Sequence, residues 1–168
     1  KQNSEKYFKL NPGAGPRHFV INNSLNIAYS INELDSTISV FKIDKENNLS
    51  NFQNISTIPN DYAEETTTAD IHFSQDGKFL YGSNRGHDSL AQFSINENGA
   101  LNFERNISTE GKTPRNFAIS KSGKFALVAN ENSDNISSFY IDKESGNLKY
   151  TGQKIQIPSP VCLLEIIK

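Results

Sequence analysis

Arginine, histidine and carboxylate side chains stand at matching places along this chain. Arg17 and His18 follow one proline, and Arg115 and Asn116 follow another, so two copies of one motif lie about 100 residues apart. Guanidinium groups bind phosphate and carboxylate oxygens and stabilise a developing oxyanion. Imidazole and carboxylate groups can accept a proton from water. Together these residue types could bind an anionic substrate and hydrolyse it, if the fold brings them together.

Other routes to hydrolysis have no support in the sequence. There is no Gly-X-Ser-X-Gly nucleophile elbow, no phosphate-binding Gly-X-X-X-X-Gly-Lys loop, and no Cys/His pairing at zinc spacing. We therefore expect no metal and no organic cofactor. A hydrolase built on this chain would use an activated water, a general base and cationic support for the oxyanion.

The two motif copies belong to a repeat. Phe19, Ile71 and Phe117 occupy one equivalent position, with separations of 52 and 46 residues. The longer first unit carries an acidic insertion at 60–65. Apolar residues alternate at a spacing of two, and Gly-containing turns separate short runs rich in β-formers. The unit length is close to that of kelch and WD40 repeats, which indicates four-stranded β-propeller blades.

The sequence therefore predicts an all-β fold made of propeller blades of four antiparallel strands. The middle blade is expected to have strands at about 69–73, 79–84, 89–95 and 101–108. The three blades should span about 16–59, 68–111 and 114–158, with lone strands at about 6–10 and 161–166. Three blades do not close a ring, since propellers have about four to eight, and the chain contains no methionine, so we expect the C-terminal part of a longer protein. The missing N-terminal blades would then be its partner.

A four-stranded meander brings the start of its first strand and the loop between its second and third strands to one end. In a propeller the first strand lines the channel, so these positions meet at one mouth. We predict a candidate site at this mouth. The starts of the first strands contribute Arg17, His18, Asp70, Arg115 and Asn116, and the loops between the second and third strands contribute Glu33, Arg85, Glu131, His87 and Asp88. The same residues have structural alternatives. Arg17 and Arg115 could form salt bridges with Glu33 and Glu131, and Asp70 could be a strut between blades.

Several other polar residues are expected to be structural. Asn32, Asn84 and Asn130 recur in every unit, which favours a role in the blade turns. His72 lies further along its strand and is expected to be a packed core histidine. The single cysteine, Cys162, lies in an apolar segment and is expected to be buried.

Composition narrows the class of partner. The chain has 17 Lys and Arg against 19 Asp and Glu, with a formal net charge of −2, which disfavours nucleic acid. No apolar run approaches the ~20 residues needed to span a bilayer, so no membrane partner is expected. One cysteine mildly favours a reducing compartment, so we expect a cytoplasmic protein, with the periplasm as the alternative.

The motifs resemble the seven-bladed lactonase family over essentially the whole chain, from Asn11 to Leu164. The likeness rests on Gly-Pro-Arg-His-Phe, on Thr-Pro-Arg-Asn-Phe and above all on Asn-Arg-Gly-His-Asp-Ser at 84–89. The family includes 6-phosphogluconolactonases and the fungal carboxymuconate cyclases. In the cyclase branch an Arg, a Glu and a second Arg are thought to be catalytic, and Arg17, Glu33 and Arg85 match them. The resemblance implies a ring of seven blades, of which this chain supplies the C-terminal half, and it places a further catalytic His in the upstream blades.

The resemblance implies metal-independent hydrolysis of 6-phospho-D-glucono-1,5-lactone. We expect Arg85 and Arg115 to bind the phosphate or the oxyanion, Arg17 to bind the lactone carbonyl, and Glu33 or His18 to activate water. His87, Asp70 and Asn116 are expected to contact the substrate. The alternatives are a cyclase-like lyase, a lactonase for another sugar acid, and a non-catalytic propeller that serves as a binding scaffold.

Overall fold

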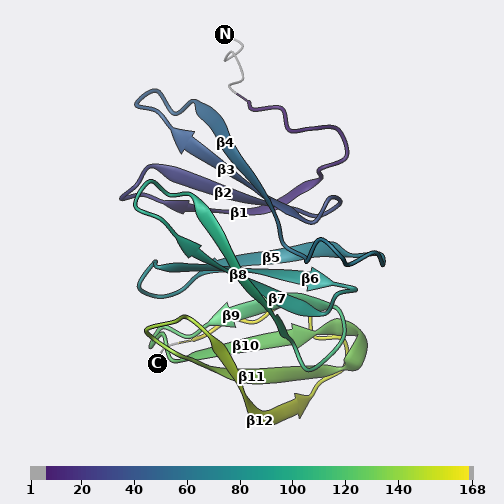
Figure 1. Ribbon diagram of the computed structural model, residues 1–168. Coiled ribbons are helices and arrows are strands. Elements are labelled where there is room, and N and C mark those ends of the chain that lie inside the picture. The colour runs from purple at the N-terminus through teal and green to yellow at the C-terminus, as the bar shows by residue number, and fades with distance from the viewer. Residues whose placement is uncertain (1–6, 167–168) are drawn as a thin grey trace.

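The computed structural model describes residues 7–166, which form three four-stranded antiparallel sheets stacked face to face (Figure 1). The first sheet contains β1 (Pro16–Asn22), β2 (Ile27–Asn32), β3 (Thr37–Ile43) and β4 (Leu49–Ser56). The second contains β5 (Thr67–Phe73), β6 (Phe79–Arg85), β7 (Ser89–Ile95) and β8 (Leu101–Ser108). The third contains β9 (Pro114–Ile119), β10 (Phe125–Asn130), β11 (Asn135–Ile141) and β12 (Leu148–Gln156).

Each sheet is a simple meander in which every strand pairs with the next along the chain. The strands of the middle sheet lie within two residues of the predicted bounds. In the described part of the chain the one helical segment is a 3₁₀ turn, Glu131–Ser133. The all-β prediction of four-stranded propeller blades is therefore confirmed.

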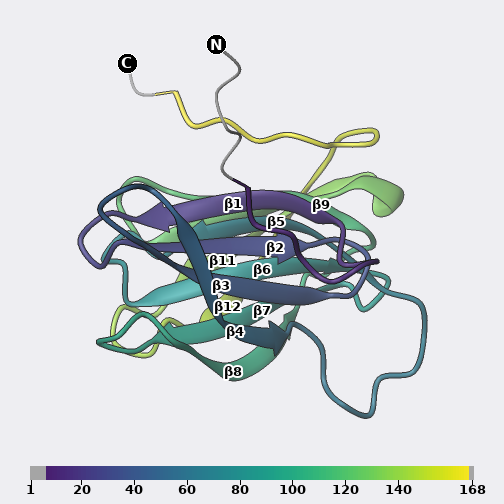
Figure 2. The same cartoon turned by 90° about the horizontal axis from the view of Figure 1, so that it is seen from above.

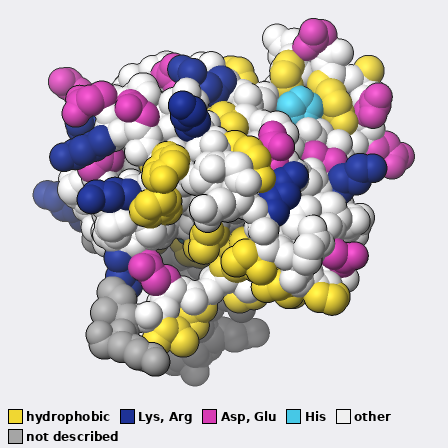
Figure 3. All heavy atoms as spheres, turned by 90° about the horizontal axis from the view of Figure 1, so that it is seen from below, with side chains coloured by type: hydrophobic (Ala, Val, Ile, Leu, Met, Phe, Trp, Pro, Cys, Tyr) yellow, Lys and Arg dark blue, Asp and Glu magenta, His cyan; other side chains and the backbone are white. Residues whose placement is uncertain are grey.

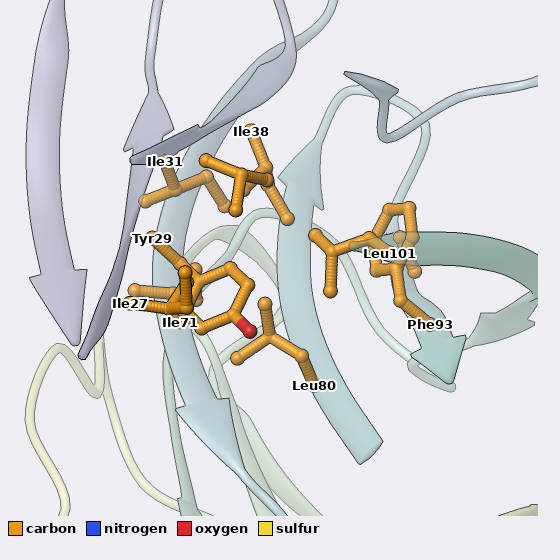
Figure 4. Packing of buried hydrophobic residues seen from close by; sticks show 10 residues of the cluster. Ile27, Tyr29, Ile31, Ile38, Ile71, Leu80, Phe93 and Leu101 are labelled. Carbon is orange, nitrogen blue, oxygen red and sulfur yellow. The ribbon is translucent and has the colours of Figure 1, made fainter. Parts of the chain in front are cut away.

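Apolar side chains fill the space between adjacent sheets. Figure 4 shows one such core, in which the first sheet's Ile31 and Ile38 approach the second sheet's Ile71 and Leu80. These side chains are at most 1% exposed. Burying a side chain of this size stabilises the fold by about 1.5–3 kcal/mol, so the face-to-face cores are the main source of cohesion. A second core between sheets two and three is centred on Leu90, Phe117 and Phe139.

Two buried tyrosines add a directional bond to these cores. Tyr29 donates its hydroxyl to the Gly99 carbonyl at 2.8 Å, and Tyr81 donates to the Gly146 carbonyl at 2.5 Å. Each bond joins the second strand of one sheet to the third-to-fourth turn of the next. Burial raises the pKa of Tyr29 to about 12 and raises that of Tyr81 as well, so both hydroxyls remain donors at neutral pH.

The first strands of the three sheets, β1, β5 and β9, lie side by side along one edge of the stack (Figure 2). This row corresponds to the channel-lining strands of a propeller. The turns after β5 and β9, which contain Gly77 and Gly123, lie at one end of the row. The starts of the strands lie at the other end, and that end carries the predicted site residues.

The recurring asparagines are structural, as expected. Asn32, Asn84 and Asn130 are at most 1% exposed. Each donates its side-chain amide to hydroxyl groups of the neighbouring third strand or its loop. In the first sheet, for example, Asn32 donates to Thr37 and Ser39. This bond closes the loop between the second and third strands in each repeat.

The predicted lone strands are not present. Residues 7–10 and 161–166 are not in strands, and position 6 lies outside the described residues. A strand requires a ladder of backbone partners. The 161–166 segment is instead held by side chains, since Leu163 N donates to Asn116 Oδ1 and Lys121 N donates to Glu165 Oε2. The prediction that Cys162 is buried is also wrong, because the thiol lies exposed in this unpaired segment.

The outer faces of the stack expose apolar side chains. Figure 3 views the molecule from the side of the third sheet, where hydrophobic groups lie among charged ones. Phe125, Leu127 and Tyr140 are 38–54% exposed on this sheet, and Phe19 and Ile21 are exposed on the first. The buried counterparts of these positions, such as Ile71 for Phe19 and Tyr81 for Leu127, pack between sheets. Both outer faces therefore have the character of blade surfaces that lack a neighbouring blade.

Replacing Tyr81 with Phe should lower the free energy of unfolding of the whole protein by about 1–2 kcal/mol, because the buried Gly146 carbonyl loses its donor. Urea denaturation followed by circular dichroism would measure this. Tyr140→Phe is the matched control, since Tyr140 is 54% exposed, and it should change the value by less than about 0.5 kcal/mol. Equal effects of the two substitutions would contradict the role of the hydroxyl bond.

Candidate active site

A β-bulge at the start of each first strand aims the site residues. In β1 the pairing with β2 skips from Pro16 to His18, and in β9 the pairing with β10 skips from Pro114 to Asn116. The extra residues are therefore Arg17 and Arg115. In β5 the irregularity covers Ala69 and Asp70, the equivalent positions. A bulge turns the extra side chain out of the regular alternation, which explains why Arg17 leaves the sheet surface and reaches the Ala69 carbonyl of β5.

The Asp70 carboxylate is the centre of the site. It is 3% exposed and lies on the middle strand of the row. Oδ1 accepts from His18 Nδ1 at 2.8 Å and from the Ile71 amide at 3.0 Å. Oδ2 accepts from His72 Nε2 at 3.0 Å, from Asn116 Nδ2 at 2.5 Å and from the Phe117 amide at 3.2 Å. One side chain thus joins all three sheets, as the strut alternative anticipated.

These donors keep Asp70 ionised. Burial alone would raise the pKa of Asp70, but the hydrogen bond and charge of His72, the hydrogen bond of His18 and the Phe117 amide outweigh it and lower the pKa to about 2. A carboxylate can accept hydrogen bonds but cannot donate them. The imidazole nitrogens that face Asp70 must therefore carry the protons.

Glu33 joins two arginines at the seam between the first and second sheets. Arg85 Nη2 is hydrogen-bonded to Glu33 Oε1, and Arg17 Nε lies 3.6 Å from Glu33 Oε2. The two guanidinium groups also donate to successive carbonyls of β5, Arg85 to Thr68 at 2.7 Å and Arg17 to Ala69 at 2.7 Å. Arg85 is 14% exposed and its Nε is buried without a partner in the described structure. Both heads are thus fixed before any ligand binds.

Arg115 is held more loosely. Its Nη1 lies 3.4 Å from Glu131 Oε2, within the same sheet, and its side chain is 39% exposed. The Arg115–Glu131 pair of the structural alternative is therefore present, but it lies within one sheet and does not connect neighbouring blades. Arg115 is the most accessible of the three cations.

The cations influence one another through space. Burial, and then the positive charge of Arg85, lower the pKa of Arg17, and Arg115 contributes in the same direction. The hydrogen bond from Arg85, assisted by the charges of Arg17 and Arg115, lowers the pKa of Glu33. All three arginines therefore share one region with the carboxylates of Glu33 and Asp70, and their field acts on Glu33. The same field makes Glu33 a weak base.

His87 has a different environment. Its Nδ1 bonds to Ser89 Oγ at 2.7 Å, and its ring packs against Tyr62 of the acidic insertion at 4.6 Å. Burial lowers the pKa of His87. The adjacent Gly86 has φ +93°, and a Cβ there would lie 2.3 Å from the Glu65 carbonyl oxygen, so glycine is required where the insertion approaches. No contact joins His87 to the arginines within the described residues.

The structure thus brings most of the predicted site residues together, and they are Arg17, His18, Glu33, Asp70, Arg85, Arg115 and Asn116. It also adds His72, which the sequence-based prediction assigned to the core. The His72 side chain is 40% exposed and bonded to Asp70. The available signal was its spacing of two residues from Asp70, which puts both side chains on one face of β5.

Within residues 7–166, no group of three or more potential metal ligands has the geometry to hold a metal ion. In the same range, no helix has the length and apolarity to cross a bilayer.

Comparison with known proteins decides the family. The model of the lactonase family of seven-bladed β-propellers matches residues 1–165. The chain belongs to this family. A 6-phosphogluconolactonase of Bacillus subtilis (strain 168) is 36% identical over 154 residues, which cover 90% of this chain and 44% of the relative. The chain spans about half the length of the curated relatives it matches.

Solved structures of similar proteins share this fold. A Lactobacillus plantarum protein superposes with a TM-score of 0.90 at 37% identity, covering 95% of this chain and 47% of that protein. The periplasmic gluconolactonase PpgL of Pseudomonas aeruginosa has a TM-score of 0.85 at 36% identity, covering 89% and 42%.

Replacing Asp70 with Asn should lower the free energy of unfolding at pH 7 by about 2 kcal/mol, the value of a carboxyl pKa lowered from 3.8 to about 2. In the wild type this stabilisation is complete above about pH 4 and is lost as the pH falls towards 2. The variant should lack this part of the pH dependence. Denaturation curves of the whole protein between pH 7 and pH 2 would test it, with the exposed Asp61→Asn as control; parallel curves for wild type and D70N would refute the assignment.

Proposed function

We propose that the whole protein hydrolyses a sugar-acid lactone, and that its substrate is 6-phospho-D-glucono-1,5-lactone. The observation that carries this proposal is the group of three arginines at one end of the first-strand row, two of them fixed by Glu33 and by β5 carbonyls. Preorganised cations in a partly buried site stabilise the oxyanion that forms when water attacks a lactone carbonyl. The B. subtilis relative is named a 6-phosphogluconolactonase, which supports the same reaction class.

The arginines suit different roles. Arg17 is anchored beside Asp70 through the Ala69 carbonyl, which fits a group that polarises the lactone carbonyl. Arg115 is the most accessible and the least constrained, which fits binding of the terminal phosphate. Arg85 is nearly buried, and its positive charge can stabilise either the oxyanion or the phosphate from the protein side of the site. Asn116 and Asp70 hold this arrangement together, and we propose that Asn116 approaches the substrate from the third sheet.

The alternatives differ in what they require of the site. The P. aeruginosa relative is named a gluconolactonase, so a lactone without phosphate is the second candidate. A cyclase-like lyase would use the same Arg17, Glu33 and Arg85 on a different substrate. A non-catalytic scaffold would present a broad apolar rim, whereas the residues at this end of the row are charged and hydrogen-bonded.

We also propose that the exposed faces of the first and third sheets contact the remaining blades of a seven-bladed ring. Exposed Phe19 and Ile21 on one face, and Phe125 and Leu127 on the other, supply the apolar surface that such contacts bury. For the compartment, the cytoplasm remains our prediction, with the periplasm as the alternative.

The direct test is an assay of the whole protein against 6-phosphogluconolactone and gluconolactone, with the rapid spontaneous hydrolysis subtracted. The proposal expects catalysed hydrolysis of the phosphorylated lactone at a higher kcat/KM. A higher kcat/KM for gluconolactone would select the second candidate. Absence of catalysis on both lactones would refute the lactonase proposal.

Arg17→Ala and Glu33→Ala should each lower kcat/KM in the whole protein by roughly 10²-fold or more, the size of the loss of one oxyanion donor. Arg17→Ala removes the cation itself, and Glu33→Ala releases the two guanidinium groups that it orients. Arg105→Ala, on the exposed outer strand β8, is the control and should leave turnover unchanged. Normal turnover with reduced stability would mean that these residues are struts between blades.

Arg115→Ala should distinguish the phosphate-binding role. We expect kcat/KM to fall by about tenfold or more for the phosphorylated lactone and by less than threefold for gluconolactone, because a charge-assisted bond to phosphate contributes about 1.5–3 kcal/mol. Steady-state kinetics with both substrates would measure the two ratios. Equal losses for the two lactones would assign Arg115 to the reacting end of the substrate instead.

A further inference from the structure

We propose that His72 is the general base that removes the proton from the attacking water, and that Asp70 orients it. This inference rests on the proposed lactonase function and identifies a catalytic residue within the same site. It differs from the sequence-based expectation, in which Glu33 or His18 activates water and His72 belongs to the core.

The bonding around Asp70 defines the protonation of both histidines. Because the ionised carboxylate can only accept, His18 carries its proton on Nδ1 and His72 carries its proton on Nε2. In the neutral ring the other nitrogen holds a lone pair. The candidate bases are therefore His18 Nε2 and His72 Nδ1.

The two lone pairs have different surroundings. His18 Nε2 faces a cation, Arg17 Nη1, at 3.3 Å, so its lone pair is engaged by that donor. His72 Nδ1 has no hydrogen-bond partner among residues 7–166. The His72 ring is 40% exposed, so this nitrogen is accessible to water. Glu33 is engaged by Arg85 and Arg17, which lower its basicity.

His72 is also held in a single orientation. Its Nε2 is fixed by Asp70 at 3.0 Å, and its ring meets the buried Phe117 ring edge-on, with centroids 4.8 Å apart and planes at 87°. Phe117 is 1% exposed and is part of the core between sheets two and three. A rigid neighbour on one side and a carboxylate on the other give the fixed geometry that a base requires.

The position of His72 along β5 fits a lactone bound to the arginines. Arg85 and Arg17 bind the carbonyls of Thr68 and Ala69, and His72 lies three residues further along the same strand. At about 3.3 Å per residue this is a separation of roughly 10 Å along the backbone. A lactone carbonyl whose oxygen is bound by Arg17, and whose carbon faces a water held on His72 Nδ1, fits within a separation of this order.

The chemical step is a general-base hydrolysis. His72 Nδ1 takes a proton from water while the water oxygen bonds to the lactone carbonyl carbon, and the carbonyl electron pair moves to its oxygen beside Arg17. When the carbonyl re-forms, the bond from this carbon to the ring oxygen breaks. The imidazolium returns its proton to that ring oxygen, which yields the open-chain hydroxy acid. Asp70 stabilises the imidazolium between the two transfers.

The test uses His72→Ala and His72→Gln in the whole protein, with Lys78→Ala at the opposite end of β5 as control. For 6-phosphogluconolactone we expect both histidine variants to lose about 10²-fold or more in kcat, with KM changed by less than threefold and the protein still folded at the assay temperature. Added imidazole should partly restore H72A activity in a saturable way. The control should turn over at the wild-type rate.

Three results would each overturn the proposal. The first is kcat within about threefold of the wild type in both variants. The second is a loss that appears in KM or in the melting temperature rather than in kcat. The third is a loss of kcat in H72A that imidazole does not relieve. A wild-type protein that does not hydrolyse lactones would instead refute the proposed function, so the two failures are distinguishable.

Discussion

A buried, ionised carboxylate on the middle of the three channel-side strands is the constraint on which the site depends. An isolated carboxylate in this position would be strongly destabilising, because burial penalises its charge. Asp70 is tolerated because five donors from β1, β5 and β9 surround it. The same donors fix the relative positions of the three strands. The same hydrogen bonds thus account for both roles considered for Asp70, as a structural link between blades and as part of the functional site.

Charge is distributed over the repeat in a complementary way. At the bulge position the three units carry Arg17, Ala69 and Arg115, and at the loop position they carry Glu33, Arg85 and Glu131. The middle unit therefore reverses the pattern of its neighbours. The small Ala69 leaves its carbonyl free for Arg17, and the cation Arg85 crosses the seam to Glu33. Identical units would carry one Arg–Glu pair each, whereas this exchange puts a second cation, Arg85, on Glu33 beside Arg17.

Within each sheet, the apolar residues that stabilise the fold and the polar residues of the candidate site lie in different places. The apolar cores lie between the broad faces of the sheets and are closed by the Tyr29 and Tyr81 hydroxyl bonds. The polar groups gather along the inner edge, where bulges interrupt the regular pairing. Because the faces supply the hydrophobic stabilisation, the edge can hold buried charges and unpaired groups such as Arg85 Nε. This arrangement lets one fold carry several chemistries at the same mouth.

The sequence by itself determined the repeat, the four-stranded units, the strand bounds of the middle sheet to within two residues and the end of the sheets at which the polar residues gather. These features follow from local periodicity, turn residues and the meander rule, none of which needs long-range contacts. The tertiary structure decided which side-chain contacts form between neighbouring sheets. The sequence-based prediction assigned His72 to the core because it lies two residues further along β5 than Asp70, and only its contacts with Asp70 and Phe117 show an accessible, oriented ring. Likewise, 161–166 has the composition of a strand but no backbone ladder, so Cys162 is exposed. The sequence pattern shows which residues are able to form a strand. Contacts with other strands determine whether that strand forms and which residues its side chains contact.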